Sequence, residues 1–193
     1  MNILFAGRLV DFKDPVTFVK AAVMLSENSF EQRHQFTIAG DGELSEECRK
    51  IAGGHENISF LGWVQPEIVE DLMIRADIFC QLSPYENLWA STLMSAMKHK
   101  RAIICTDSGY TNTCLKHGYH AYLIPPKNHI ALAEAIKVLA KNGEMRRMLG
   151  ENAHAFVQEN LSLDKIAGQI RHLLLQSLGA FNAKNQEENL STA

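Results

Sequence analysis

Two cationic side chains follow the first apolar segment of this 193-residue chain at a spacing that suits an anion. Arg8 ends the run "NILFAGR" (2–8), and Lys13 directly precedes the Asp14-Pro15 pair, where we expect a helix to begin. An arginine offers a planar fork of donors and a lysine a point charge, while the free N–H groups of a helix start add partial positive charge. The arrangement suits a diphosphate. Two solvated surface cations are the alternative that spacing alone leaves open.

A lone carboxylate stands at a similar place later in the chain. An apolar run ends at Ser83, Glu86 follows three residues later, and a helical pattern that includes Leu93, Ala96 and Met97 comes next. A carboxylate at the junction of a strand and a helix can accept hydrogen bonds from ligand hydroxyls. A solvated loop glutamate or a helix cap is the alternative.

The turn Gly40-Asp41-Gly42 is weak evidence of a site by itself, because such a sequence forms a turn far more often than it binds a ligand. The chain has neither the G-x-x-x-x-G-K-[ST] pattern of a P-loop nor the G-x-G-x-x-G pattern of a dinucleotide site. Neither of those two phosphate-binding loops is therefore predicted.

Short apolar runs alternate with amphipathic helical patterns along most of the chain. We expect six strands, at 2–8, 34–40, 57–62, 77–83, 102–107 and 120–125. This alternation predicts an α/β fold with a doubly wound, mostly parallel sheet of about six strands flanked by helices. Ligands of such sheets bind beyond the carboxyl ends of the strands, where Arg8, Glu86 and the glycine turn would lie.

Helical patterns dominate the rest of the chain. Asn128 can cap one helix, and two others are expected at about 144–158 and 163–178. We divide the chain into a main domain at 1–160, a C-terminal helix at 161–180 and a polar tail at 181–193. The tail is expected to be disordered because it has too few apolar residues to form a core.

The composition excludes several classes of protein. With 46% hydrophobic and 21% charged residues, the chain is long enough to form one globular domain with a core. The net charge of −3 gives no electrostatic case for nucleic acid or anionic lipid. No segment predicts a transmembrane helix or a secretion signal, and the four cysteines show no C-x-x-C spacing. We expect a reduced, cytoplasmic setting, and the eight histidines show no spacing typical of a metal site.

Six segments in one order resemble a known family. They are "ILFAGRLVDFKDPVTFVKAA", "FTIAGDGELSEECRKIA", "ISFLGWV", "SPYENLWASTLMSAM", "AIICTDSG" and "AYLIPPKNHIALAEAI". Together they look like the C-terminal, donor-binding half of a GT-B fold retaining glycosyltransferase, from the large family called glycosyl transferases group 1. The resemblance covers residues 2–175 and implies a Rossmann-like domain that binds a nucleotide diphosphate sugar such as a UDP- or GDP-sugar.

The resemblance implies roles for matched positions. Arg8 and Lys13 would hold the diphosphate and stabilise it as it leaves, and Glu86 would orient the donor sugar; these three are the candidate catalytic residues. Trp63 falls where packing would explain an aromatic residue as well as base contact does. The candidate donor-binding residues are Gly7, Gly40, Asp41, Gly42, Trp63, Val64, Asn87, Ser95 and Gly109. Members of the family need no metal, so none is expected here, and no further cofactor is expected.

The chain departs from the family pattern at two acidic positions. Ser95 stands where a second glutamate, a ribose ligand, is expected, and strict counting from Glu86 gives Met94 instead. In the later loop Thr113 replaces another acid, and Tyr110 narrows a space that glycine keeps open. Loss of a charged acceptor weakens binding by about 1.5–3 kcal/mol per bond, so a different donor or a weakened enzyme is conceivable.

The function predicted from this resemblance is donor binding in a glycosyltransferase of glycan or polysaccharide synthesis. We expect the chain alone to be inactive without an N-terminal acceptor domain or partner subunit. In relatives the last helix packs on that domain; otherwise Ile166, Ile170, Leu173 and Leu174 would form an apolar stripe that predicts self-association. The full-length protein could be peripheral at the inner membrane face. The alternatives are a non-catalytic nucleotide-binding or assembly module with a degenerate donor site, and a sugar-nucleotide epimerase.

Overall fold

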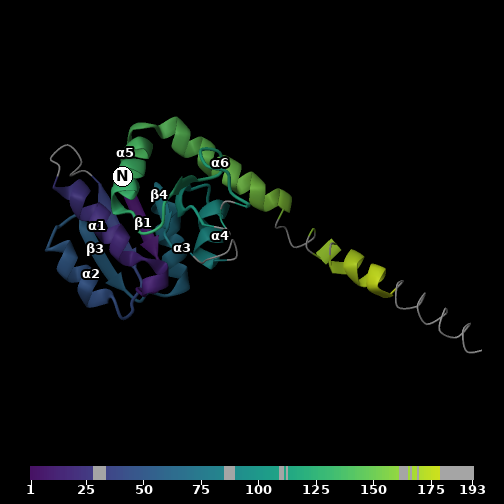
Figure 1. The fold of residues 1–193 in the computed structure, drawn as a ribbon, viewed down its shortest axis with the longest axis horizontal. Coiled ribbons are helices and arrows are strands. Elements are labelled where there is room, and N and C mark those ends of the chain that lie inside the picture. Colours follow the sequence, from purple (N-terminus) through teal and green to yellow (C-terminus); the bar gives the residue numbers. More distant parts are fainter. Residues whose placement is uncertain are drawn as a thin grey trace, which may run out of the picture. The chain divides into compact units, whose positions relative to one another are not determined.

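A parallel sheet of six strands forms the centre of the fold in the computed structural model (Figure 1). The strand order is β3-β2-β1-β4-β5-β6, and every neighbouring pair is parallel. The strands are β1 (Asn2–Ala6), β2 (Gln35–Ala39), β3 (Ile58–Gly62), β4 (Ile78–Gln81), β5 (Ala102–Thr106) and β6 (Tyr122–Ile124). The doubly wound α/β sheet predicted from the sequence is confirmed. The structure describes residues 1–27, 34–84, 90–108, 111, 113–160, 165, 167–168 and 170–178.

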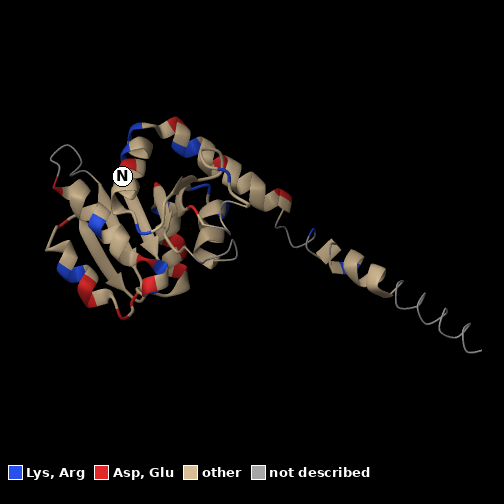
Figure 2. Ribbon diagram, in the orientation of Figure 1, with Lys and Arg blue, Asp and Glu red and all other residues tan. Residues whose placement is uncertain are grey.

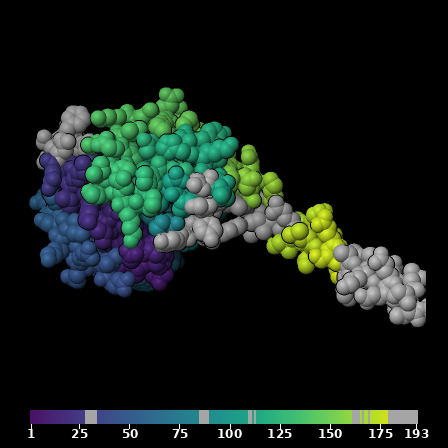
Figure 3. Space-filling view, in the orientation of Figure 1, coloured from purple at the N-terminus to yellow at the C-terminus, as the bar shows by residue number. Residues whose placement is uncertain are grey.

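Helices cover the sheet. They are α1 (Pro15–Ser26), α2 (Ser45–Ala52), α3 (Pro66–Arg75), α4 (Ser91–Lys98), α5 (His129–Lys141) and α6 (Gly143–Asn160), with a short 3₁₀ helix, η1, at Asp11–Lys13. The strand order reverses direction after β3, so right-handed connections put α1 and α2 on one face and α3 and α4 on the other. In agreement, α1 packs against α2 and α5, and α3 packs against α4 (Figures 1 and 3).

The helix starts follow from local sequence. Pro15 and Pro66 occupy the first positions of α1 and α3, where a missing N–H breaks no hydrogen bond. The predicted cap at Asn128 is confirmed, because its side chain accepts a hydrogen bond of 2.9 Å from the N–H of Ala131. These starts direct the N-termini of α1 and α3 toward the carboxyl edge of the sheet, since each helix follows the carboxyl end of a strand.

The core is apolar and aromatic. The ring of Phe18 on α1 lies 5.6 Å from that of Phe5 and 6.1 Å from that of Phe36, which join the helix to β1 and β2. Both β4 and β5 are buried along their whole length. Cys80 and Cys105 are buried in these two strands, as expected of small apolar side chains, and burial raises the pKa of both thiols.

The chain divides into two compact units, residues 1–155 and 156–193. The division falls inside α6, somewhat before the domain limit at 160 that the sequence suggested. In the second unit the described residues between 165 and 178 are helical, and Ile170, Leu173 and Leu174 are exposed. Ile166 and the tail at 181–193 lie outside the described residues.

Charged residues of both signs are interspersed over the elements drawn in Figure 2. This mixture agrees with the small net charge of −3. Among the described residues, no helix is both long and apolar enough to cross a membrane.

Candidate functional site

The loops that follow β1 and β2 are joined through their backbones at the carboxyl edge of the sheet. The N–H of Gly7 donates to the carbonyl of Ala39, and the N–H of Leu9 to that of Asp41, both at 2.9 Å. The N–H of Leu44 donates back to the carbonyl of Leu9, also at 2.9 Å. These bonds fix the backbone on both sides of Arg8, so its side chain starts from a defined position.

Glycine is needed where these two loops meet. A Cβ at Gly40 would lie 1.9 Å from the carbonyl oxygen of Gly7, and the φ of Gly40 is +143°. A Cβ at Gly42 would lie 2.5 Å from the carbonyl oxygen of Leu9. Real Cβ atoms do not approach backbone so closely, which explains both glycines of the turn by packing.

Asp41 uses its carboxylate locally. Its Oδ1 accepts hydrogen bonds from the hydroxyl of Ser45 at 2.5 Å and from the N–H of Gly42 at 2.8 Å. These two donors lower the pKa of Asp41 below its usual value, with Ser45 the larger cause. The contacts lie at the start of α2, so the side chain orders the turn that leads into this helix.

Arg8 and Lys13 contact the same aromatic ring. The Cζ atom of Arg8 and the Nζ atom of Lys13 each lie 5.3 Å from the centroid of Phe12 on η1. The Lys13 side chain also passes beside Gly7, where a Cβ would be 3.9 Å from its Cδ. The carboxylate of Asp11 is turned to Lys127, at 2.9 Å. The structure thus brings together the two cations that the sequence singled out, and the sequence analysis missed both η1 and Phe12.

A hollow opens beside Arg8 and continues toward α4. The first part, about 200 Å³, is lined by Gly7, Arg8, Gly40 and Asp41 among others. The second part, about 280 Å³, is lined by residues of α3 and α4. Both parts share Trp63, Val64, Val69 and Thr92, so we call them together the edge groove.

The edge groove contains most of the described donor-site candidates. Its lining includes Gly7, Arg8, Gly40, Asp41, Trp63, Val64 and Ser95. Trp63 is 67% exposed, so packing into the core does not explain it. Gly42 lies in the supporting turn and Lys13 beside the groove. Glu86, Asn87 and Gly109 lie outside the described residues, as does Tyr110.

A carboxylate that the sequence analysis did not single out also lines the edge groove. Oε2 of Glu70 on α3 accepts a hydrogen bond from the Ser95 hydroxyl at 2.5 Å, and Oε1 contacts Lys98 Nζ at 3.0 Å and His99 Nε2 at 2.6 Å. The hydrogen bonds from Ser95, His99 and Lys98 lower the pKa of Glu70 to about 2. Residues 70 and 95 are far apart in sequence, so no local pattern announces this pair.

The loop after β5 is closed by a buried hydroxyl. Thr111 donates to the carbonyl of Thr106 at 2.6 Å and accepts from the N–H of Ser108 at 3.0 Å. Thr113 is exposed and lines neither part of the edge groove. Within the described part of the chain, no cluster of three His, Cys, Asp or Glu side chains could hold a metal ion.

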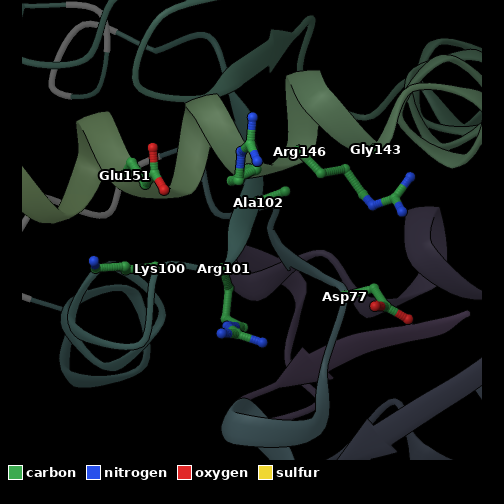
Figure 4. A pocket seen from close by; sticks show the side chains of 8 residues that line it. Asp77, Lys100, Arg101, Ala102, Gly143, Arg146 and Glu151 are labelled. Carbon is green, nitrogen blue, oxygen red and sulfur yellow. The ribbon is translucent and has the colours of Figure 1, made fainter.

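A second, more basic pocket lies at the opposite, amino edge of the sheet (Figure 4). It has about 330 Å³, and four of its lining residues are Lys100, Arg101, Arg146 and Arg147. In Figure 4, Lys100 and Arg101 lie on one wall, and Arg146 and Glu151 belong to α6 across from them. Two of the guanidinium groups are bound to helix ends. Arg101 donates to the carbonyls of Ile74, Ala76 and His99, and Arg146 to those of Leu139 and Ala140.

The chain belongs to the family of glycosyl transferases group 1, whose family model matches residues 2–156. It is 32% identical over 155 residues to a Campylobacter jejuni protein, covering 78% of this chain and 42% of that relative. That relative is GalNAc-alpha-(1->4)-GalNAc-alpha-(1->3)-diNAcBac-PP-undecaprenol alpha-1,4-N-acetyl-D-galactosaminyltransferase. An alpha-D-kanosaminyltransferase from Streptomyces kanamyceticus is 24% identical over 178 residues, with 89% of this chain and 45% of the relative covered. The chain therefore spans under half the length of these curated relatives.

Solved structures confirm the fold. The C-terminal domain of a glycosyl transferase group 1 family protein, LpcC, from Francisella tularensis superposes with a TM-score of 0.72 at 21% identity, covering 84% of this chain and 86% of that one. Anabaena Alr3699/HepE, in complex with UDP and glucose, gives a TM-score of 0.77 at 17% identity, with 91% of this chain and 48% of that chain covered. The Rossmann-like fold of a GT-B C-terminal domain is thus shown for this chain.

Proposed function

We propose that this chain binds the nucleotide diphosphate sugar of a retaining glycosyltransferase of glycan or polysaccharide synthesis. The observation that carries the proposal is the pair Arg8 and Lys13, which lie over one ring beside the edge groove at the carboxyl edge of the sheet. The proteins it resembles support the same function, since relatives are named as sugar transferases and the Anabaena structure holds UDP and glucose.

The two cations have separate tasks in this proposal. The Arg8 guanidinium can bind two phosphate oxygens at once, whereas the Lys13 ammonium supplies a compact charge beside them. Both charges would stabilise the diphosphate as the bond to the sugar breaks, so no metal ion would be required for neutralisation. Glu86 would orient the donor sugar by accepting hydrogen bonds from its hydroxyls.

The groove also offers a place for the base. Trp63 and Val64 form an apolar wall shared by both parts of the edge groove, and the Trp63 ring is accessible for stacking. A nucleotide with its diphosphate at Arg8 could lay its base along this wall.

Binding by the full 193-residue chain tests the proposal. We expect calorimetry to detect UDP or GDP, or one of their sugars, and Arg8→Ala to lower that affinity by about tenfold to a hundredfold, because a charged hydrogen bond to phosphate is lost. Arg147→Ala is the matched control, since it removes an arginine from the opposite edge of the sheet. Chelation by EDTA should leave the affinity unchanged.

A non-catalytic module is the competing function, and the same titrations decide between the two. Failure of every nucleotide to bind would overturn the donor site and favour the module. We further expect no sugar transfer by this chain alone, because the acceptor pocket would belong to an N-terminal domain or partner. Robust transfer by the 193-residue chain would contradict that expectation.

A further inference from the structure

The inference concerns the part of the edge groove farther from Arg8. There the Oε2 atom of Glu70 and the Oγ atom of Ser95 lie 2.5 Å apart, brought together from α3 and α4. The side chain of Glu70 is 36% exposed, and both residues line the groove. Two polar atoms at this spacing, open to a hollow, form a contact point for a ligand.

The hydrogen bonds already made define which ligand groups would fit. A carboxylate has about four acceptor sites and a hydroxyl has two acceptor sites beside its one donor. Lys98 and His99 occupy Oε1 of Glu70, and Ser95 donates its only hydrogen to Oε2. One site on Oε2 and the lone pairs of Ser95 Oγ remain. The pair can therefore only accept hydrogen bonds, so its ligand must bring donors.

Lys98 and His99 hold the carboxylate in place. Because a carboxylate only accepts hydrogen bonds, the Nε2 atom of His99 is the protonated ring nitrogen in this contact. With Oε1 held by two donors and Oε2 by a third, the acceptor pair is ordered before any ligand arrives. An ordered acceptor loses less entropy on binding than a mobile one.

We propose that Glu70 and Ser95 together bind a vicinal diol, and that this diol is the 2′,3′-diol of the ribose in the nucleotide donor. Two neighbouring hydroxyls can each donate one hydrogen bond, which matches two neighbouring acceptors. The inference rests on the proposed function. With the diphosphate at Arg8 and the base on the Trp63 and Val64 wall, the ribose joins the two and lies on the α3–α4 side of the phosphates. A carboxylate absent from position 95 is then supplied by Glu70 of α3.

A double comparison of ligands and variants tests the inference. UDP and GDP are each titrated into the full chain together with their 2′,3′-dideoxy counterparts. We expect the unaltered chain to prefer the ribonucleotide by about tenfold to a hundredfold, since two hydrogen bonds to a charged acceptor pair are at stake. Glu70→Gln should abolish this preference by weakening the ribonucleotide and leaving the dideoxynucleotide unchanged.

Two further variants exclude a purely structural role. Glu67→Gln removes an exposed carboxylate from the first turn of the same helix and should change neither affinity. Ser95→Ala deletes one acceptor with little change in volume and should reduce the preference in part. Thermal unfolding of every variant shows whether the fold is retained.

The outcomes separate the two proposals. If binding depends on Arg8 but Glu70→Gln weakens ribo- and dideoxynucleotides equally, or neither, the diol site is refuted while the donor site stands. If the unaltered chain binds no nucleotide, the proposed function fails and the diol site fails with it.

Discussion

The two edges of the sheet carry similar numbers of cations but bind different things. At the amino edge Arg101 and Arg146 donate to five carbonyl oxygens at the ends of α3, α4 and α5, so these arginines fasten helices. At the carboxyl edge the described contact of Arg8 is the face of Phe12. Because a guanidinium has five donors and a ring face engages none of them in a strong hydrogen bond, Arg8 retains its capacity for an anion. The partners of a cation, more than the charge of a pocket, indicate its role.

Glycine contacts make the edges alike in another respect, and they give the largest expected effects. Gly40→Ala would place a Cβ 1.9 Å from a backbone oxygen at the carboxyl edge, and Gly150→Ala would place one 2.1 Å from the carbonyl of Lys100 at the amino edge. We expect each to lower the free energy of unfolding by about 4 kcal/mol or more, measured by urea denaturation.

Gly54→Ala separates backbone strain from close approach. Its φ is +81° and no atom lies within 4 Å of the added Cβ, so about 1–2 kcal/mol should be lost. Equal losses at positions 40 and 54 would show that the contact between the two loops is not what requires glycine.

Arginine variants should behave in opposite ways at the two edges. Arg101→Ala leaves three helix-end carbonyls without their donor, and we expect about 2–3 kcal/mol of lost stability with nucleotide affinity unchanged. Arg8→Ala should leave unfolding unchanged and weaken nucleotide binding. Chemical denaturation and calorimetry on both variants would reveal a contrary pattern, which would remove the distinction between the edges.

Glu70 predicts a pH dependence of stability near the carboxyl edge. Its pKa is lowered from 4.5 to about 2 by Ser95, His99 and Lys98, so the folded state favours the charged form. The resulting stability is present above pH 4.5 and is lost as the pH falls toward 2. Because the side chain is 36% exposed, we expect only about 1 kcal/mol.

The check is the difference in unfolding free energy between the unaltered chain and Glu70→Gln. The difference should be largest above pH 4.5 and vanish near pH 2. A difference independent of pH would mean that the three donors do not favour the charged form.

Asp14 gives the smallest expected effect, with the opposite sign. Burial raises the pKa of Asp14, and its Oδ2 has no hydrogen-bond partner among the described residues. The folded state therefore binds the proton more tightly, so this contribution is full below pH 3.8 and is lost as the pH rises through the raised value. Asp14→Asn should stabilise the chain by about 0.5 kcal/mol at neutral pH and not at pH 3.

Asn suits the left-handed backbone of position 14, where φ is 55°. The control is Asp11→Asn, which breaks an exposed pair with Lys127 and should change stability by at most about 1 kcal/mol in the unfavourable direction. Destabilisation by Asp14→Asn at neutral pH would show that the buried charge is compensated.

The fold and one side of the site could be predicted from the sequence. Buried parallel strands read as continuous apolar runs, and helix starts are marked by local residues such as Pro15 and Asn128, so the alternation of elements is encoded locally. Arg8 and Lys13 are five positions apart on one strand-to-helix junction, which makes their proximity a local property as well. The turn at Gly40 was visible, but its reason was not, because the atom that excludes a side chain belongs to Gly7 on another loop.

The sequence by itself determined the parallel α/β fold, the family and the two neighbouring cations, since each depends on short-range pattern. Only the tertiary structure decided that Phe12 serves both cations, that Glu70 meets Ser95 across two helices, and that Arg101 is bound to helix ends while Arg8 is not. The physical reason is that hydrogen bonds and close packing act over a few ångströms between atoms, whatever number of residues separates them along the chain.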